Sequence, residues 1–216
     1  MPPAEGGGME IKMHKVLKTI PKGNRTQVFV DDNNSFLLYK GEMRKYHIEP
    51  DMELEDETYR EILEVLYKRA KERALYLLDD SYKTEKQIRD KLKGGCYPES
   101  IINNVIIYLT EYGLVDDLRY AKLYIEYKSS SKSKKQIVQD LYVKGIQKII
   151  IDEAFEESEY SDEKSLNKIV KKRISRYNLN EPKDVQKLYR YLVAKGYSYI
   201  DVRKTIDKYS DESYYD

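Results

Sequence analysis

The sequence predicts a mostly α-helical protein, a tandem array of three three-helix repeats that follows a small N-terminal β-hairpin or sheet. Three observations predict this fold. One apolar pattern occurs three times, apolar residues after Pro50 recur at three- and four-residue steps, and short apolar runs before Pro50 are separated by turn-forming residues. Because three-helix units of this size bury little surface alone, we expect them to gain their core by stacking into an elongated, curved array.

The composition is that of an ordinary soluble chain. Its 216 residues, 40% of them apolar, suffice to bury a core in one or two domains. No stretch approaches the roughly 18 consecutive apolar residues of a membrane span, and the start lacks the apolar region of a secretory signal. We therefore expect a cytosolic protein. The single cysteine, Cys96, cannot form an internal disulfide.

The net charge of +1 hides a modest asymmetry along the chain. Residues 1–64 hold 9 Lys and Arg against 13 Asp and Glu, whereas residues 65–216 hold 30 against 25. This excess permits the C-terminal part to contact phosphates without requiring it, because a strongly basic domain would be more unbalanced.

The N-terminal part is predicted to be a β extension over residues 9–54. The apolar runs 27–30 and 36–39 flank an Asp/Asn/Ser cluster at 31–35, a composition that favours a turn and hence a hairpin. Residues 11–17 are the candidate for a third strand. Residues 1–8, MPPAEGGG, precede a second methionine and are interpreted as an expression remnant outside the fold.

The remainder is predicted to be helical to about Tyr209. A long helix and the first repeat occupy 55–115, the second repeat 116–163 and the third 164–209, with an acidic tail over 210–216 that is expected to fray. Asp56 or Glu57 lies near the positive end of the long helix. Its apolar face consists of Tyr59, Ile62, Leu63, Leu66, Ala70, Ala74 and Leu77.

The internal repeat is the strongest signal. Seven positions match in three copies, at offsets of 49 and then 51 residues. The copies are Thr84, Ile88, Leu92, Cys96, Tyr97, Ile102 and Ile106, then Ser133, Ile137, Leu141, Gly145, Ile146, Ile151 and Phe155, then Asp184, Leu188, Leu192, Gly196, Tyr197, Val202 and Ile206.

Each matched position has a physical role at a helix start, on a helix face or at a helix end. Thr84, Ser133 and Asp184 are residue types that cap helix starts, and Gln87 and Gln136 follow at capping-box spacing. The central leucines, Leu92, Leu141 and Leu192, are expected in equivalent surroundings.

The end of each middle helix favours a glycine, because that position usually requires a positive φ. Gly145 and Gly196 meet this requirement in the second and third repeats. Cys96 departs from it, and Gly94 with Gly95 is expected to end the first helix early.

The repeat and its motifs resemble the RecX family of regulators of the RecA recombinase, over about residues 70–208. The family's acidic pair followed by Arg-aromatic-Ala is matched by Asp116-Asp117-Leu118-Arg119-Tyr120-Ala121. Its Leu-x-x-Lys-Gly-Ile motif is matched by residues 141–146, with a related form at 192–197. The sequence departs from the family at Cys96, where glycine is usual, and at 129–133, where serines and a lysine replace a glycine-containing loop.

The resemblance implies a regulator without enzymatic activity and without a cofactor, which binds the RecA filament on single-stranded DNA. It would limit filament growth, ATP hydrolysis, strand exchange and RecA-assisted cleavage of repressors, and so act in homologous recombination, DNA repair and the SOS response. It also implies a monomer that reaches single-stranded DNA through the filament and does not use a membrane. Two alternatives stay open: a stand-alone nucleic-acid-binding protein with helix-turn-helix-like units, and a helical scaffold for another partner.

Basic residues in all three repeats are the candidate contacts to the filament or to DNA. They are Lys83, Lys86, Arg89 and Lys93 in the first repeat, Lys128, Lys132, Lys134 and Lys135 in the second, and Lys168, Lys171 and Lys172, beside Lys164, in the third. Amines at such positions contact phosphates and add salt-dependent affinity. The competing interpretation is a solvated loop in the second repeat, and pairing with the upstream acidic residues in the third.

Catalytic or metal-binding chemistry is poorly supported by the sequence. His14 and His47 both lie in the β extension, far from Cys96 in sequence, so neither a zinc site nor a Cys-His pair is indicated. No phosphate-binding glycine motif occurs within the folded part. The adjacent Asp116 and Asp117 are interpreted as a helix start rather than as metal ligands. The 22 tyrosines mostly occupy apolar helical positions, and none is assigned to nucleic acid.

Overall fold

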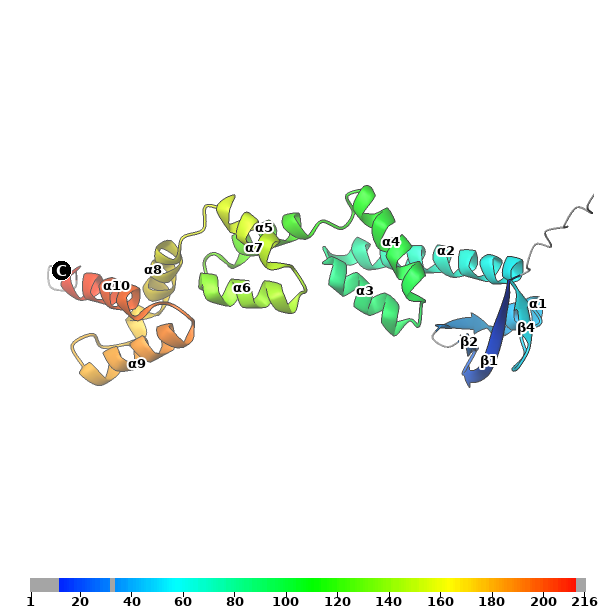
Figure 1. Ribbon diagram of the computed structural model, residues 1–216. Coiled ribbons are helices and arrows are strands. Elements are labelled where there is room, and N and C mark those ends of the chain that lie inside the picture. The colour runs from blue at the N-terminus through cyan, green and yellow to red at the C-terminus, as the bar shows by residue number, and fades with distance from the viewer. Residues whose placement is uncertain (1–11, 32–33, 213–216) are drawn as a thin grey trace, which may run out of the picture. The chain divides into compact units, whose positions relative to one another are not determined.

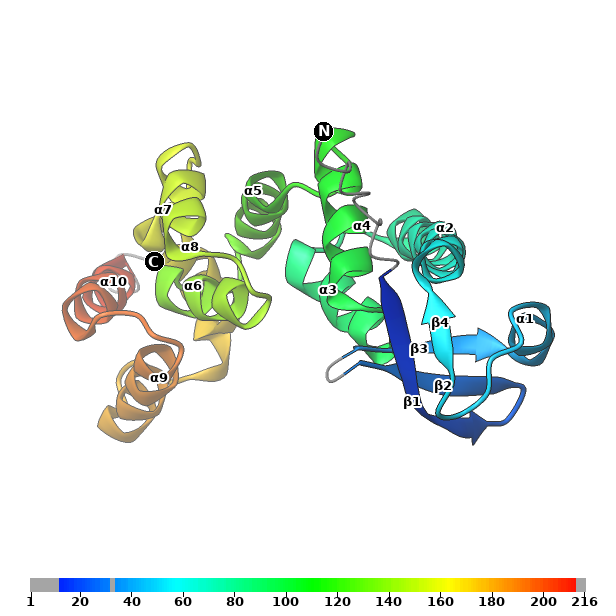
Figure 2. The ribbon, with the colours of Figure 1, turned by 45° about the vertical axis from the view of Figure 1, so that its right-hand side comes forward.

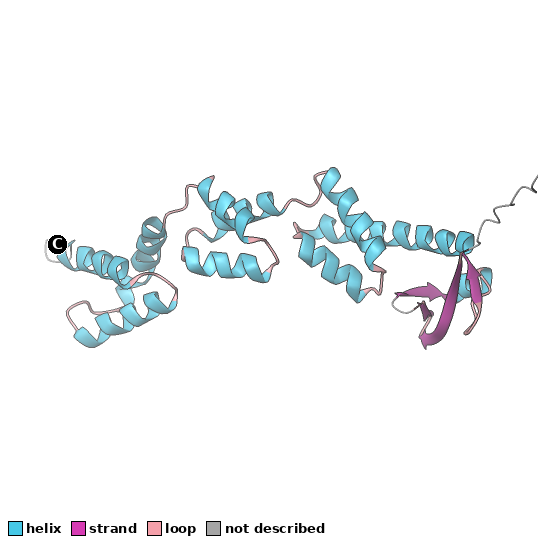
Figure 3. Cartoon of the chain, in the orientation of Figure 1, coloured by secondary structure: helices cyan, strands magenta, loops and turns pink. Residues whose placement is uncertain are grey.

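A computed structural model of the chain describes residues 12–31 and 34–212. It divides into two compact units, one of residues up to 83 together with 87–115, the other of residues 84–86 together with those from 116 onward. The first unit contains a sheet and helices, and the described part of the second unit is helical throughout (Figures 1 and 3). The predicted expression remnant, residues 1–8, lies outside the described residues.

The N-terminal sheet has four antiparallel strands among the described residues, in the order β3-β2-β1-β4 (Figure 2). The strands are β1 (Met13–Lys22), β2 (Arg25–Val30), β3 (Asn34–Tyr39) and β4 (Glu53–Glu55). The predicted hairpin of β2 and β3 is confirmed, and the candidate third strand proves longer than expected. The three-residue β4 and the short helix α1 (Lys40–Lys45) were not predicted from the sequence.

One face of the sheet packs on the long helix α2 (Asp56–Asp80). Alternate residues of the strands, among them Val28, Val30, Phe36 and Leu38, are fully buried, as expected for strands with one covered face. The predicted apolar face of the helix is confirmed in its main part, because Tyr59, Ile62, Leu66, Ala70 and Ala74 are all buried.

The three repeats are confirmed. The first repeat joins the end of α2 to α3 (Glu85–Gly94) and α4 (Glu99–Glu111). The second consists of α5 (Asp117–Lys128), α6 (Lys134–Val143) and α7 (Lys148–Glu156). The third consists of α8 (Asp162–Arg173) with the 3-10 turn η1 (Ile174–Arg176), α9 (Pro182–Ala194) and α10 (Tyr199–Glu212). The last helix therefore runs three residues past the predicted end at Tyr209.

The central leucines have equivalent surroundings, as predicted. Leu92, Leu141 and Leu192 are fully buried on the middle helices α3, α6 and α9. Each leucine carbonyl accepts a hydrogen bond from the amide five residues later, at N···O distances of 3.3, 3.1 and 3.4 Å. This bond closes a Schellman turn at each helix end.

The expectation that the repeats gain their core by stacking is wrong for the second and third repeats. Buried apolar residues form three separate clusters, one of which joins the sheet to the first repeat, while the second and third repeats each enclose their own. The cluster of the second repeat consists of Ala121, Ile125, Ile137, Leu141, Ile146, Ile151, Ala154 and Phe155.

The first repeat ends its middle helix as the other two do, so the expectation of an early stop was wrong. The helix α3 ends at Gly94, the position equivalent to Val143 and Ala194. Cys96 adopts a φ of +56°, in the left-handed region that Gly145 and Gly196 occupy at +90° and +88°. The turn tolerates a cysteine because the surrounding hydrogen bonds from the amides of residues 95–97 hold it in place.

The predicted helix caps differ between repeats. Ser133 caps α6 as predicted, since its Oγ accepts the amide of Gln136 at 3.3 Å. The reciprocal half of that capping box is absent, because Gln136 Oε1 is buried without a hydrogen-bond partner among the described residues. The cap predicted at Asp184 was wrong. Pro182, whose fixed φ suits the first turn of a helix, starts α9 earlier, and the N-cap is Glu181.

The strained conformation of Cys96 leads to a first prediction. A left-handed conformation costs a non-glycine residue about 1–2 kcal/mol, and the greater freedom of glycine in the unfolded chain offsets about 0.5–1 kcal/mol of that. We expect Cys96→Gly to raise the free energy of unfolding, measured by urea titration, by about 0.5–1 kcal/mol. Cys96→Ala removes the thiol but keeps the strain, and is the control. A glycine variant no more stable than the alanine variant would contradict the prediction.

Candidate functional site

A pair of hydrogen bonds joins the second and third repeats. Ser133 is fully buried, and its Oγ donates to the carbonyl of Lys195 at 2.6 Å. The amide of the next residue, Lys134, donates to Asp162 Oδ1 at 2.9 Å. The first turn of α6 thus binds the end of α9 and the start of α8 in the following repeat. We call this pair of bonds the joint.

The same joint occurs one repeat earlier. Thr84 Oγ1 donates to the carbonyl of Lys144 at 2.7 Å, and the amide of Glu85 donates to Asp117 Oδ1 at 3.0 Å. Thr84 stands 49 residues before Ser133, and Lys144 stands 51 residues before Lys195, so the joint follows the sequence repeat. Burial raises the pKa of Asp117, although the bond from the Glu85 amide opposes this shift.

The two helix-ending glycines have a second role in the joint, which the sequence analysis missed. A Cβ added at Gly196 would lie 2.8 Å from Ser133 Oγ and 3.3 Å from the Cβ of Lys135. A Cβ added at Gly145 would overlap the side chain of Lys86. Glycine is therefore required at both positions for its conformation and also because the preceding repeat approaches so closely.

Further hydrogen bonds strengthen the second joint around the carbonyl of Lys132. That oxygen accepts from Tyr160 Oη at 2.9 Å and from Ser165 Oγ at 3.1 Å. Tyr160 Oη also lies 2.7 Å from Asp162 Oδ1, and Ser165 Oγ lies 2.8 Å from Tyr197 Oη. Burial raises the pKa of Tyr197 to about 12, and burial with the bond to Asp162 raises the pKa of Tyr160 even more. Both phenols therefore stay protonated as donors.

The basic loop of the second repeat is largely engaged within its own repeat. The Lys132 ammonium pairs with Asp140, which also accepts from Tyr124 Oη at 2.8 Å. Burial opposes ionisation of Asp140, but these two bonds hold its pKa below the usual range. Two more amines of the set lie over aromatic rings: Lys128 Nζ is 4.3 Å from the Tyr127 centroid and Lys134 Nζ is 4.7 Å from the Phe155 centroid. The Cβ and Cδ atoms of the exposed Lys135 border Gly196.

The basic candidates of the first repeat are also engaged within the chain. Lys83 Nζ bonds to Ser81 and lies 3.8 Å from a carboxylate oxygen of Asp80. Arg89 and Lys93 share the carboxylate of Glu99, at 3.4 and 3.2 Å. The remaining member, Lys86, packs against Gly145 at the first joint.

The helix α8 presents the most open positive charge of the candidate sets. Its lysines at 164, 168, 171 and 172 are all exposed and follow the spacing of one helix face. None of the four forms an ion pair within the described part of the chain. Of the upstream acidic residues, Glu157 pairs with Lys122 instead. We call Lys168, Lys171 and Lys172 the lysine face.

A cavity of about 480 Å³ borders this helix in the second unit. Lys164 and Lys168 line it from α8, facing Lys122, Glu126 and Glu157. Its mixed charge makes it a weaker anion site than the open lysine face.

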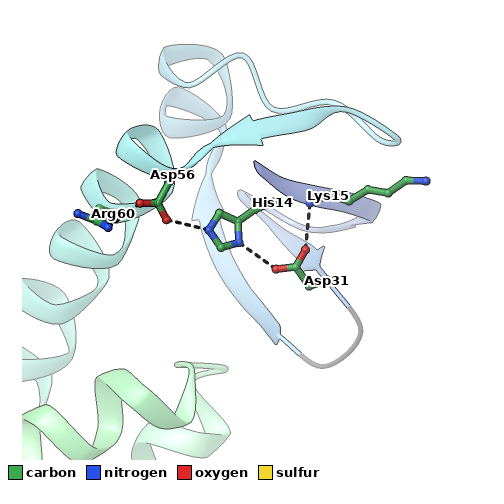
Figure 4. A network of polar contacts seen from close by, with 5 residues as sticks. All are labelled: His14, Lys15, Asp31, Asp56 and Arg60. Atoms are coloured by element: carbon green, nitrogen blue, oxygen red, sulfur yellow. Dashed lines mark hydrogen bonds and ion pairs between the residues drawn. The ribbon is translucent and has the colours of Figure 1, made fainter. Parts of the chain in front are cut away.

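A buried histidine in the first unit lies between two aspartates (Figure 4). His14 Nδ1 lies 2.9 Å from Asp31 Oδ2, and Nε2 lies 3.1 Å from Asp56 Oδ1. The hydrogen bond to His14 is the main cause that lowers the pKa of each aspartate. The ring stacks on Tyr59 with centroids 4.1 Å apart. Because both ring nitrogens are engaged, this cluster fastens β1, the turn after β2 and α2 to one another.

Within residues 12–31 and 34–212, no three His, Cys, Asp or Glu side chains are grouped in a way that could hold a metal ion. None of the helices in that part is both long and apolar enough to cross a membrane. The adjacent acidic pair acts at a helix start: Asp116 caps α5 by accepting the amide of Arg119 at 2.9 Å.

Each of the three repeats matches a three-helix domain of one known protein family. Residues 70–109, 116–154 and 161–206 match, in series, the first, second and third three-helix domains of RecX. The chain belongs to the RecX family. A protein named Regulatory protein RecX from Clostridium tetani is 34% identical over 93% of this chain and 97% of its own length. One from Clostridium beijerinckii is 34% identical over 87% and 90%.

Solved structures of RecX proteins share the fold. A crystal structure of regulatory protein RecX superposes with a TM-score of 0.60 at 25% identity, covering 90% of this chain and 99% of that one. RecX from Lactobacillus salivarius superposes with a TM-score of 0.58 at 26% identity, covering 66% and 96%. The relatives' names describe a regulatory protein, so a regulatory role is assigned to this RecX protein as well.

The joint of this RecX protein leads to a second prediction. Ser133→Ala leaves the Lys195 carbonyl unpaired and should lower the free energy of unfolding by about 1–3 kcal/mol. Ser133→Asp tests whether the loss comes from the helix cap or the joint, because aspartate caps a helix but cannot donate to the carbonyl. We expect the Asp variant to be at least as destabilised as the Ala variant, and Ser131→Ala, at an exposed loop position, to change stability by less than about 0.5 kcal/mol. Full stability of the Asp variant would contradict the joint.

Proposed function

We propose that the chain regulates the RecA recombinase by binding its filament on single-stranded DNA and limiting filament growth, ATP hydrolysis, strand exchange and coprotease activity. The match of three consecutive RecX domains carries this proposal. We further propose that it acts as a cytoplasmic monomer without enzymatic activity, since its partner is a DNA-bound filament.

A repeat protein is a suitable ligand for a polymer. Each filament subunit offers the same surface again, and related surfaces on successive repeats bind successive subunits with a gain in effective concentration. The joint makes this possible within the second unit, because it sets the third repeat on the second through two hydrogen bonds.

Among the basic candidates, the lysine face is our choice for contact with phosphates. When exposed amines without protein partners bind DNA phosphates, the counterions condensed on the DNA are released. This release is the main source of salt-dependent affinity. Most basic groups of the first repeat and of the 128–135 loop are held by carboxylates or lie over aromatic rings, so they have less to gain from a phosphate. The lysine face would also suit a protein that binds nucleic acid without RecA, and titration of oligonucleotides alone distinguishes the two functions.

The first functional prediction concerns ATP hydrolysis. Adding the protein to RecA on single-stranded DNA should slow hydrolysis at substoichiometric amounts, because one bound regulator affects the growth of a whole filament. A coupled ATPase assay measures the rate. An unchanged rate at equimolar protein would count against the proposed function, and tight duplex binding without RecA would favour the stand-alone alternative.

A second functional prediction concerns the lysine face. Replacing Lys168 and Lys172 with Ala should weaken filament binding and lower the slope of log affinity against log salt by about 1–2, as expected when two phosphate contacts are lost. The matched control replaces Lys204 and Lys208, two exposed lysines at the same spacing on α10. Equal salt slopes for the two variants would remove the lysine face from the site.

A further inference from the structure

The third repeat has a docking position that no described residue of the chain fills. In the second repeat, the first turn of the middle helix, residues 133–135, receives the third repeat at the joint. Residues 84 and 85 form the same two bonds with Lys144 and Asp117. The repeat register places residues 184–186 of α9 at the equivalent position.

This position differs in chemistry from its two counterparts. Val185 stands where the earlier repeats have Glu85 and Lys134, and Gln186 stands where they have Lys86 and Lys135. A cavity of about 820 Å³ opens here, and its lining includes Pro182, Val185, Tyr189, Val193 and Tyr199. We call these five residues the apolar docking face.

The apolar docking face leaves large apolar side chains in solvent. Val193 is 42% exposed and Tyr199 is 62% exposed, and the rings of Tyr189 and Tyr199 lie 5.3 Å apart. Clustered exposed apolar side chains of this kind mark interaction sites in soluble proteins. Because the equivalent turn of the second repeat forms an interface with the third repeat, this face continues an established mode of contact.

Asp184 excludes another repeat of the same kind as the occupant. At both joints a hydroxyl donates to a helix-end carbonyl, whereas Asp184 presents a carboxylate. Bonds from Lys187 Nζ at 2.9 Å and from the Asn178 amide at 3.2 Å hold its pKa below the usual range, so it stays ionised. A helix-end carbonyl from a second copy of this chain would therefore meet an acceptor instead of a donor.

We propose that the apolar docking face binds an apolar helical segment of a RecA subunit, at the place where the earlier repeats receive the helix end of the next one. This proposal rests on the proposed function. The cavity is also lined by Arg190, which is exposed and forms no ion pair within the described part of the chain. The bound segment should accordingly carry a carboxylate beside its apolar residues.

The test replaces the two exposed apolar residues of the face. Val193→Ser with Tyr199→Ser should weaken binding to the RecA filament on single-stranded DNA at least tenfold. The slope of affinity against salt should stay unchanged, because no phosphate contact is lost. Tyr199→Phe keeps the ring and should bind as the wild type does. The matched control is Ile107→Ser with Tyr112→Ser, another exposed aliphatic residue and another exposed tyrosine packed on a neighbouring ring, and it should bind normally.

The possible outcomes distinguish a failure of the docking proposal from a failure of the proposed function on which it rests. If the wild type binds the filament and the Val193/Tyr199 variant, with an unchanged melting temperature, binds equally well, the docking proposal fails and the proposed function stands. If the wild type does not bind the filament, both fail. If sedimentation shows a wild-type dimer that the same variant dissociates, the occupant is a second copy, and the assignment to RecA is overturned.

Discussion

The joint between repeats is the interaction on which the rest of the structure depends. The second and third repeats each enclose their own apolar cluster, so their mutual placement is left to directional polar contacts. A single net hydrogen bond contributes only about 1 kcal/mol, but a buried group left without its partner costs about 1–3 kcal/mol. The joint therefore fixes the arrangement of the two repeats more than it adds to the stability of the fold. Any arrangement that leaves the Ser133 hydroxyl or the Lys195 carbonyl without a hydrogen bond has a higher free energy.

The joint also explains where the repeat pattern is strict and where it is relaxed. Gly145 and Gly196 satisfy two demands, a positive φ and the absence of a side chain beneath the preceding repeat. Cys96 has the same left-handed backbone with a side chain present, so at that position the backbone demand alone applies. Asp184 departs from the hydroxyl that both joints use, and its own repeat receives no described residue at that turn. The two departures from the repeat pattern thus lie in the first and the last repeat.

The repeats could be predicted from patterns among neighbouring residues. Hydrogen bonds between residues far apart in the sequence could not be predicted in this way. The period of Ile88 and Leu92 and their counterparts predicted the helices, and the Asp/Asn cluster predicted the hairpin. The partners of Thr84 and Ser133 lie about sixty residues away, and no local pattern gives such a pairing. The serine was predicted as a helix cap, which is correct, but its hydroxyl also donates. The three-residue β4 is too short to show a period, and Pro182 moved the start of α9 because a fixed φ outweighs the repeat register.

The same contacts separate the basic residues of the three repeats, among which the sequence favoured the 128–135 loop. Amines near the joint or near carboxylates are part of the fold, and the exposed lysines of α8 remain available to bind a partner.

The joint is tested most directly by amide hydrogen exchange on the intact protein. First-turn amides of helices normally lack a partner and exchange quickly, but those of Glu85 and Lys134 donate to Asp117 and Asp162. We expect both to exchange much more slowly than the first-turn amide of Lys148, whose helix has no side-chain cap. Exchange of Glu85 and Lys134 as fast as that of Lys148 would contradict the joint.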